Sequence, residues 1–309
     1  MKFSLLLLIF IHLTVFAQQE IYVYKNPQDS TRNAYLKIIP ETDSIKGIVV
    51  RDFTRLPDTS KSSPYHFQDL CSENGVLTLY TSTTVTFPEL FVEDSVMQEL
   101  DDIIAEVVED HQIPQQNIFM GGISASGTRA LRYTAYCAQG KSKNGIQIKG
   151  AFAVDSPLDL TRFYTSIERN KDNFLSGMKW EGDYMEDFFL ELFKGDIHSN
   201  AKAYENASVY AQHKEEGGNA VALKNTSLIL FHEPDIDWWL KERGCSYFDI
   251  NSFDIAAFVL ELRAQGNEDV ALVTTTGKGF DRKGNRKPHS WTIVDEQLLL
   301  NWIIERIDE

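Results

Sequence analysis

The stretch NIFMGGISASGTRALRYTAYCA, residues 117–138, joins an apolar run to a helix-forming segment through a turn of small residues. A chain that stops as a strand near Gly122 and re-enters a helix near Ser126 must turn sharply, and bulky side chains would collide there. In the pattern small-x-serine-x-small, Ser124 lies at the tip, and Gly122 and Ser126 occupy the positions that must be small. The sequence therefore predicts a corner that displays one serine.

Strand-like and helix-like segments alternate on both sides of this corner. Short β-branched and aromatic runs indicate strands, and apolar residues at helical spacing indicate helices. This alternation predicts an α/β fold with a doubly wound, mostly parallel sheet and helices on both faces. Strands are expected at 20–26, 34–41, 45–53, 75–85, 116–122, 148–157, 226–235 and 269–276, and the longer helices at 91–111, 252–266 and 291–307.

Residues 158–225 interrupt the alternation with a long segment that is rich in aromatic side chains. We expect this segment to be irregular. Its position after a predicted strand is compatible with a lid inserted over the carboxyl edge of the sheet, and equally with a second packing layer. Residues 18–309, this segment included, are predicted to form one domain, since a chain of this length can bury a single large core.

The N-terminus has the pattern of a secretory signal peptide. Lys2 precedes the apolar run 3–16, and Val15 and Ala17 are the small residues that a signal peptidase reads. The run is shorter than the roughly 20 residues that a bilayer span needs, so an uncleaved anchor is the less favoured alternative. The sequence predicts a signal peptide at 1–17 and a secreted or periplasmic protein without stable membrane insertion after cleavage.

Charge and cysteine content exclude several classes of function. The chain has 45 acidic and 30 basic residues and a formal charge of −15, which should repel nucleic acid. Cys71, Cys137 and Cys245 lack metal-ligand spacing and are expected as buried thiols, with one disulfide as the alternative. We expect no metal or organic cofactor and a small acyl compound as substrate.

The corner has a chemical use if Ser124 is a nucleophile. A serine in a tight strand-to-helix turn has an exposed hydroxyl, and the next backbone N–H, that of Ala125, can stabilise an oxyanion at the start of the helix. Ser126 is a rival nucleophile, although the β-branched Thr128 makes its pattern worse. The alternative without chemistry is a strand-to-helix turn whose serines only cap the helix.

A serine hydroxyl needs a base, and the base needs an acid that orients it. His289 follows a predicted strand and a loop and precedes the last helix, from where an imidazole can reach the corner. The acid is expected after the strand at 226–235. Asp235 is favoured, Asp237 is the alternative and Glu233 is third, and the chain order serine, aspartate, histidine is one known order of a triad.

These segments resemble the α/β-hydrolase superfamily, in particular its secreted esterase-like and peptidase-like members. The resemblance is strongest in PQQNIFMGGISASGTRAL and KPHSWTIVDEQLLLNWI. It implies that Ser124 is the nucleophile, His289 the base and Asp235 the acid, with Ala125 N–H as one oxyanion donor. The implied activity is a carboxylic-ester hydrolase, with a serine peptidase or a catalytically weak binding protein of the same fold as alternatives.

Two positions depart from the pattern of the superfamily. Ser126 replaces the usual second glycine of the turn, which is a tolerable change to a small residue. The loop RDFTRLP, residues 51–57, stands where the superfamily often has a His-Gly pair that supplies the second oxyanion N–H. Phe53 N–H is the expected substitute, with Asp52 and Thr54 as alternatives. The Asp52 carboxylate would repel an oxyanion unless Arg51 or Arg55 pairs with it.

Overall fold

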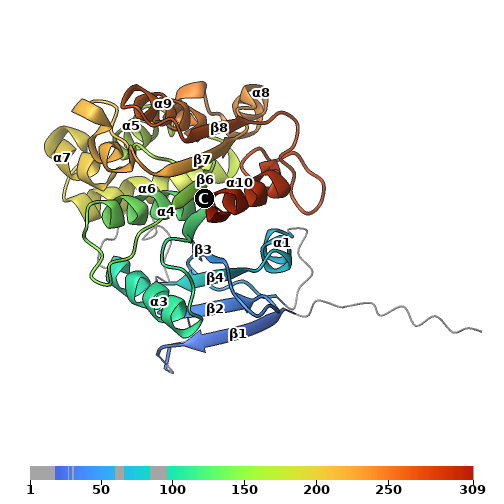
Figure 1. Ribbon diagram of the computed structural model, residues 1–309. Helices are drawn as coiled ribbons and strands as arrows, with labels where there is room; N and C mark the ends of the chain where they lie inside the picture. The colour runs from blue at the N-terminus through green and yellow to red at the C-terminus, as the bar shows by residue number, and fades with distance from the viewer. Residues whose placement is uncertain (1–17, 27, 30, 60–65, 84–95, 309) are drawn as a thin grey trace, which may run out of the picture.

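One sheet organises the chain in the computed structural model, which describes residues 18–26, 28–29, 31–59, 66–83 and 96–308 (Figure 1). The expected signal peptide at 1–17 lies outside the described residues. Among those residues, eight strands form a sheet in the order β1-β2-β4-β3-β5-β6-β7-β8. The strands are β1 (Gln19–Tyr24), β2 (Ala34–Ile39), β3 (Gly47–Asp52), β4 (Val76–Ser82), β5 (Ile118–Ile123), β6 (Gly150–Val154), β7 (Ser227–His232) and β8 (Val270–Thr274).

The sheet is mostly parallel, as the sequence predicts. Strand β2 runs antiparallel to both of its neighbours, β1 and β4, and every pairing from β4 to β8 is parallel. Strands β3, β4 and β6 are buried along their whole length, which explains their near-continuous apolar sequences. The expected α/β fold class is therefore confirmed.

Helices cover both faces of this sheet. The helices are α1 (Phe67–Glu73), α3 (Met97–Asp110), α4 (Ala125–Ala138), α5 (Leu160–Asn170), α6 (Ser176–Phe193), α7 (Ile197–Ala207), α8 (Ile236–Trp238), α9 (Asn251–Ala264) and α10 (Glu296–Asp308). Shorter 3-10 or π turns are η2 (Glu215–Leu223), η3 (Trp239–Arg243), η4 (Tyr247–Asp249) and η5 (Trp291–Ile293). The last helix thus begins five residues later than expected, after the turn η5.

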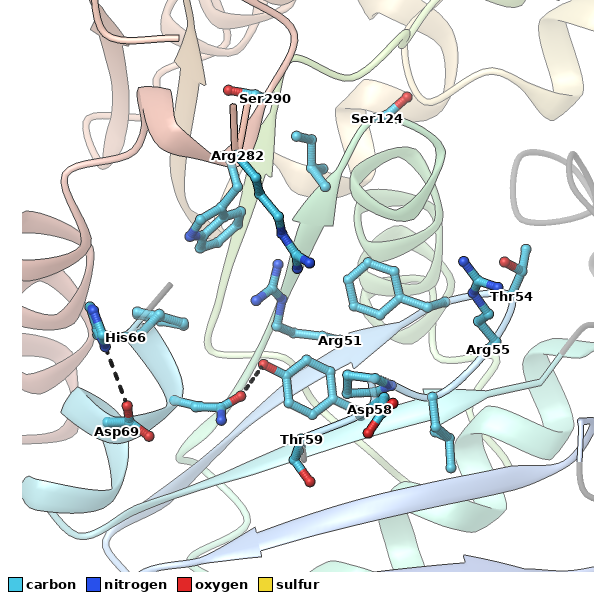
Figure 2. A pocket seen from close by; sticks show the side chains of 18 of the residues that line it. Arg51, Thr54, Arg55, Asp58, Thr59, His66, Asp69, Ser124, Arg282 and Ser290 are labelled. Atoms are coloured by element: carbon cyan, nitrogen blue, oxygen red, sulfur yellow. Dashed lines mark hydrogen bonds and ion pairs between the residues drawn. The ribbon is translucent and has the colours of Figure 1, made fainter. Parts of the chain in front are cut away.

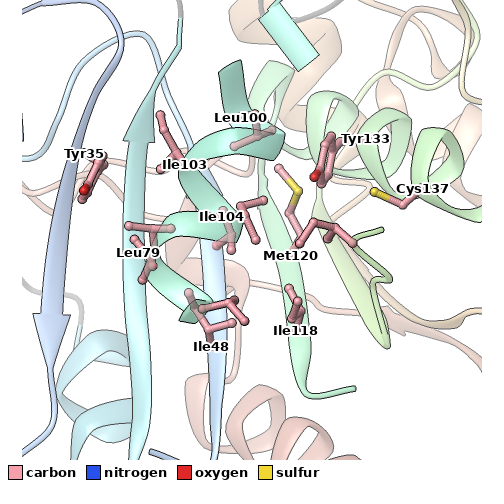
Figure 3. Packing of buried hydrophobic residues seen from close by; sticks show 14 of the residues in the cluster. Tyr35, Ile48, Leu79, Leu100, Ile103, Ile104, Ile118, Met120, Tyr133 and Cys137 are labelled. Atoms are coloured by element: carbon pink, nitrogen blue, oxygen red, sulfur yellow. The ribbon is translucent and has the colours of Figure 1, made fainter. Parts of the chain in front are cut away.

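Alternate residues of the strands face opposite layers. In β5, Ile118 and Met120 pack with α3 and α4 in one buried cluster (Figure 3), whereas Phe119 packs with α1 and α10 in another. In β7, Leu230 faces α9 and Phe231 faces α10. The period of two along the strands therefore builds a three-layer arrangement, with α3, α4 and α9 on one side of the sheet and α1 and α10 on the other.

The expectation of an irregular segment at 158–225 is wrong, because α5, α6, α7 and η2 lie there. Met185, Phe189 and Phe193 recur four residues apart and point to one side of α6, where they are buried. The buried cluster that they join extends to Ala125 at the start of α4. Most aromatic side chains of this segment form a core, and that helical period was readable in the sequence.

Two further features of the described residues concern the cysteines and the possibility of a membrane-spanning helix. Cys71, Cys137 and Cys245 are free thiols and all three are buried, as favoured from the sequence. No helix within the described part of the chain combines the length and the apolarity that a bilayer crossing needs.

Candidate active site

Ser124 lies at a strained corner between β5 and α4. Its φ is 54° and its ψ is −132°, a backbone conformation that residues other than glycine adopt only at an energetic cost. A Cβ on Gly122 would overlap Ser126, and a Cβ on Gly127 would lie 2.8 Å from the Gly122 carbonyl oxygen. The small residues of the turn are therefore required by the close approach of strand and helix, and Gly127 adds a third such position.

Ser126, the rival serine, points the other way. Its side chain is 3% exposed, and its hydroxyl donates a hydrogen bond to the backbone carbonyl of Asp52. A hydroxyl that is buried and committed to a carbonyl inside the fold is unavailable to a substrate. Ser124 is the half-buried member of the pair and lines a large cavity.

The neighbouring strand β6 ends in a second strained residue, Asp155, with a φ of 44°. In the parallel pairing of β5 and β6, Ile123 is opposite Val154, so Ser124 and Asp155 each follow their strand by one residue. Ser124 N–H donates to the Val154 carbonyl at 2.9 Å, which ties the two strand ends together. Because adjacent strands lie about 4.8 Å apart, the sheet holds Ser124 and Asp155 side by side.

His289 is bound to this aspartate. The His289 Nδ1 atom lies 2.6 Å from Asp155 Oδ2, and the side chains of the pair are 30% and 5% exposed. Since an ionised carboxylate only accepts hydrogen bonds, Nδ1 carries the hydrogen and Nε2 is the ring nitrogen left for another partner. Ser124 and His289 line the same cavity, and no hydrogen bond joins the Ser124 hydroxyl to the ring in this structure.

The cavity has a volume of about 970 Å³ and opens between the carboxyl ends of the strands and the loops that follow them. Figure 2 shows Ser124 at its edge together with Thr54, which follows β3, and Arg282, which lies in the loop before His289. The size is near the upper end of the usual range for small-molecule sites. The described residues contain no cluster of histidine, cysteine or acidic side chains placed to hold a metal ion.

No protein-family model matches the sequence, and no curated protein matches it either. Solved structures do match. The carboxyl esterase 2 of the mycorrhizal fungus Tuber melanosporum has a TM-score of 0.57 at 13% identity, over 95% of this chain and 86% of the other. Acylaminoacyl peptidase of Pyrococcus horikoshii has a TM-score of 0.55 at 14% identity, over 95% of this chain and 42% of the other. A puromycin hydrolase has a TM-score of 0.57 at 10% identity, over 95% of this chain and 40% of the other.

This chain has the α/β-hydrolase fold. The strand order, the single antiparallel strand β2 among parallel ones and the serine after β5 agree with that assignment. The chain spans less than half the length of the acylaminoacyl peptidase and of the puromycin hydrolase, so it is similar to one part of each.

Within this α/β-hydrolase fold, the expected pairing of Asp235 with His289 is wrong. Asp235 caps α8 through the N–H of Trp238 and accepts hydrogen bonds from Arg286 at 2.7 and 3.1 Å. Asp237, the alternative, is exposed on α8. Both aspartates follow β7, which lies one strand farther from Ser124 than β6. Asp235 is moreover bound by Arg286, a residue of the loop that carries His289.

Glu233, the third candidate acid, anchors that loop. It pairs with Arg286 and accepts hydrogen bonds from the Thr275 hydroxyl and from the N–H groups of Lys278 and Gly279. Burial alone would raise the pKa of Glu233, but these hydrogen bonds and the Arg286 charge hold it below its usual value. The carboxylates after β7 therefore position the loop that carries His289, without contacting the imidazole.

The prediction that Phe53 N–H is the second oxyanion donor is also wrong. Its N–H donates to the Thr81 carbonyl at 2.9 Å and extends the pairing of β3 with β4. Thr54 is the next residue, it lines the cavity, and its N–H has no acceptor among the described residues. Ala125 opens α4, and N–H groups of a first helical turn have no acceptor inside the helix. Ala125 at the corner and Thr54 in the lining of the same cavity as Ser124 thus offer backbone N–H donors without an acceptor among the described residues.

Asp52 does not present its charge to the corner. Its carboxylate is fully buried, accepts hydrogen bonds from the hydroxyls of Thr81 and Thr83 at 2.7 to 3.0 Å, and lies 3.9 Å from Arg129. Burial raises the pKa of Asp52, although the Arg129 charge and the two hydroxyls oppose this. Asp52 forms no ion pair with Arg51 or Arg55 among the described residues, and its buried carboxylate is bound by Arg129 and the two threonines instead.

Glu181 of α6 is a residue near the site that sequence reasoning missed. Burial raises the pKa of Glu181, against the attraction of His289 and Arg243. Burial also acts to lower the pKa of His289, but the charge and hydrogen bond of Asp155, with a smaller contribution from Glu181, raise it overall despite Lys287. No local sequence pattern links α6 to the histidine loop, because only the tertiary packing brings them together.

We therefore expect Glu181→Gln to move the pH dependence of any His289-dependent activity. The variant removes one charge that favours the imidazolium, so the pKa of His289 should fall towards its ordinary value. A base acts in its neutral form. On the acid side of the pH profile, kcat/KM should therefore rise at a lower pH in the variant than in the wild type, and the variant should be faster there. Glu191→Gln, an exposed glutamate of the same helix, should leave the profile unchanged. Identical acid limbs for all three proteins would contradict this role of Glu181.

Proposed function

We propose that this protein is an exported serine hydrolase that cleaves carboxylic esters through an acyl-enzyme on Ser124. The observation that carries the proposal is the register of β5 and β6, which sets Ser124 beside Asp155 while Asp155 binds His289. The elbow geometry of Ser124 and the solved hydrolases of the same fold support it. The sequence of residues 1–17 supports export.

In the proposed reaction, Ser124 Oγ attacks the ester carbonyl as His289 Nε2 takes the hydroxyl proton. Asp155 keeps the imidazole in the tautomer with hydrogen on Nδ1 and stabilises the imidazolium that forms. The N–H groups of Ala125 and Thr54 stabilise the oxyanion. His289 then gives its proton to the leaving alkoxide. Water repeats the sequence on the acyl-enzyme and releases the carboxylic acid and Ser124.

Two alternatives have support of their own. A serine peptidase is supported by the similarity to acylaminoacyl peptidase, which is one of the matched structures. A binding protein with weak catalysis is supported by the use of Phe53 N–H in the sheet and by the missing hydrogen bond between Ser124 and His289. The esterase is favoured over the binding protein because catalytic hydrogen bonds often form only with substrate, and because Thr54 N–H remains available. It is favoured over the peptidase because this chain covers 86% of the matched esterase but only 42% of the matched peptidase.

Matched substrates separate these functions. The purified protein is assayed on 4-nitrophenyl esters of increasing acyl length, on acetylated sugars and on peptide 4-nitroanilides. We expect ester cleavage with kcat/KM at least about a hundredfold above that for the amides, since an amine leaves less readily than a phenolate. Comparable or faster amide cleavage would assign a peptidase, and turnover no faster than buffer on every substrate would assign the binding protein.

A further inference from the structure

The cavity beside Ser124 concentrates positive charge in an acidic protein. The chain carries a formal charge of −15, yet Arg51, Arg55, Arg282 and Lys287 all line this cavity. None of the four forms an ion pair with a carboxylate among the described residues; Arg51 is buried, whereas Arg55, Arg282 and Lys287 are exposed. Such a group of cations in one site indicates that a negative partner binds there.

Arg51 is the most informative of them. Its side chain is only 7% exposed, and its Nε atom is buried without a hydrogen-bond partner. Three rings hold the guanidinium: the centroids of Trp291, Phe53 and Tyr80 lie 4.0, 5.3 and 5.6 Å from its central carbon. Ring faces offset part of the cost of burying a cation, and the Tyr80 hydroxyl interacts with the guanidinium as a hydrogen-bond partner, but Nε has no acceptor. Arg51 is thus fixed in place with donors to spare.

Arg282 completes the arrangement from the opposite wall. It lies in the loop that leads to His289, and Figure 2 shows its guanidinium pointing towards that of Arg51. Two like charges that face each other across a cavity repel, and an anion between them would remove that repulsion. Two guanidinium groups also match the paired oxygens of a carboxylate, which arginine binds in a bidentate manner.

The acidic side chains that line the cavity do not neutralise these arginines. Asp69 pairs with His66 at 3.5 Å and accepts a hydrogen bond from Gln18, and the Glu20 carboxylate accepts one from the Thr59 hydroxyl. Asp58, the third acid of the cavity, has a partner of its own. The positive charge therefore remains available to a ligand.

We propose that the substrate carries a carboxylate, which binds between Arg51 and Arg282 while its ester group lies at Ser124. This inference rests on the proposed ester hydrolysis at Ser124, because it names the substrate class of that reaction. A cavity of about 970 Å³ accommodates both groups of such a molecule. The reaction is unchanged: the free carboxylate binds and orients, and takes no part in bond making.

Two pairs of esters test the proposal, each differing only in a methyl cap on the carboxylate. 4-Nitrophenyl hydrogen adipate against its methyl ester places the charge on the acyl side. 4-Acetoxybenzoate against its methyl ester places the charge on the leaving group. We expect kcat/KM to favour the charged member of at least one pair by tenfold or more, since hydrogen bonds to charged groups are stronger than those to neutral groups. Equal or lower values for the charged member of both pairs would overturn the proposal.

Single substitutions test whether Arg51 and Arg282 are the residues that bind the carboxylate. Arg51→Met keeps the length of the packed side chain, and Arg282→Gln changes an exposed side chain that the fold does not require. Each should lose at least tenfold more kcat/KM on the charged ester than on its methyl ester. Lys143→Gln, an exposed lysine outside the cavity, removes the same charge and should keep the wild-type ratio. A ratio that survives both arginine variants would overturn the assignment to Arg51 and Arg282.

A binding measurement separates this proposal from the proposed function. If the wild type cleaves no ester, hydrolysis at Ser124 fails, and calorimetry with adipate on Ser124→Ala then decides the carboxylate site. Binding that is lost in Ser124→Ala/Arg282→Gln would support the site without the reaction. Absence of adipate binding in that case would overturn the site as well.

Discussion

Asp155→Asn is expected to lower kcat/KM for an ester substrate by about 10⁴-fold, the loss known for the corresponding change in a serine protease triad. Asp155 accepts the His289 Nδ1 hydrogen at 2.6 Å, and asparagine can instead present its NH₂ group there. The imidazole would then hold its hydrogen on Nε2, the wrong nitrogen for a base. Steady-state kinetics on the best chromogenic ester measure the effect.

Asp235→Asn is the matched control for this prediction. Asp235 contacts Arg286 and caps α8, and Glu233 still holds Arg286 when the Asp235 charge is removed. The variant should therefore lose less than about tenfold in kcat/KM. A large loss for Asp235→Asn with a small one for Asp155→Asn would restore the aspartate favoured by sequence and refute the geometry of the His289 site.

Ser124→Ala is expected to lower kcat/KM by about 10⁴- to 10⁶-fold, because no other hydroxyl at the corner faces the cavity and only the oxyanion donors and binding contacts remain. Ser126→Ala removes a buried hydroxyl that bonds to the Asp52 carbonyl, and it should keep activity within about tenfold. Thermal unfolding of both variants checks that the fold survives. Equal losses for the two serines, with intact folding, would contradict the separate roles given to them.

The sheet and its helices could be predicted because they follow from local periodicity. Alternating apolar residues in β5 and the apolar stripe of α3 need no knowledge of distant contacts. The segment 158–225 differs, because its many aromatic residues interrupt the alternation of strand-like and helix-like segments and predict irregular structure. The spacing of Met185, Phe189 and Phe193 shows that their helical period carried the signal.

The site was predictable to the extent that one local motif and the chain order define it. The small residues around Ser124 determine the elbow, and the place of His289 before the last helix limits where the imidazole can lie. The acid that orients His289 could not be predicted in this way, since Asp155 and Asp235 both follow a buried strand. Only the strand order, with β6 next to β5, and the capture of Asp235 by Arg286 distinguish them.

The oxyanion donor and the substrate-binding arginines depend on details that sequence does not carry. Whether Phe53 or Thr54 has a free N–H depends on where the pairing of β3 with β4 ends, which is a matter of one residue. Asp52 is next to Arg51 and close to Arg55 in the sequence, which does not show which side chain its carboxylate meets. Side chains alternate along a strand, so Asp52 faces Arg129 instead, and Arg51 faces the rings of the cavity.

Fluorophosphonate labelling with peptide mapping tests the central claim most directly, since this probe reacts with an activated serine and needs no knowledge of the substrate. The account predicts one adduct on the folded protein, located on Ser124, that persists in Ser126→Ala, disappears in Ser124→Ala and forms far more slowly in Asp155→Asn. An unlabelled folded protein, or an adduct that remains after Ser124→Ala, would contradict it.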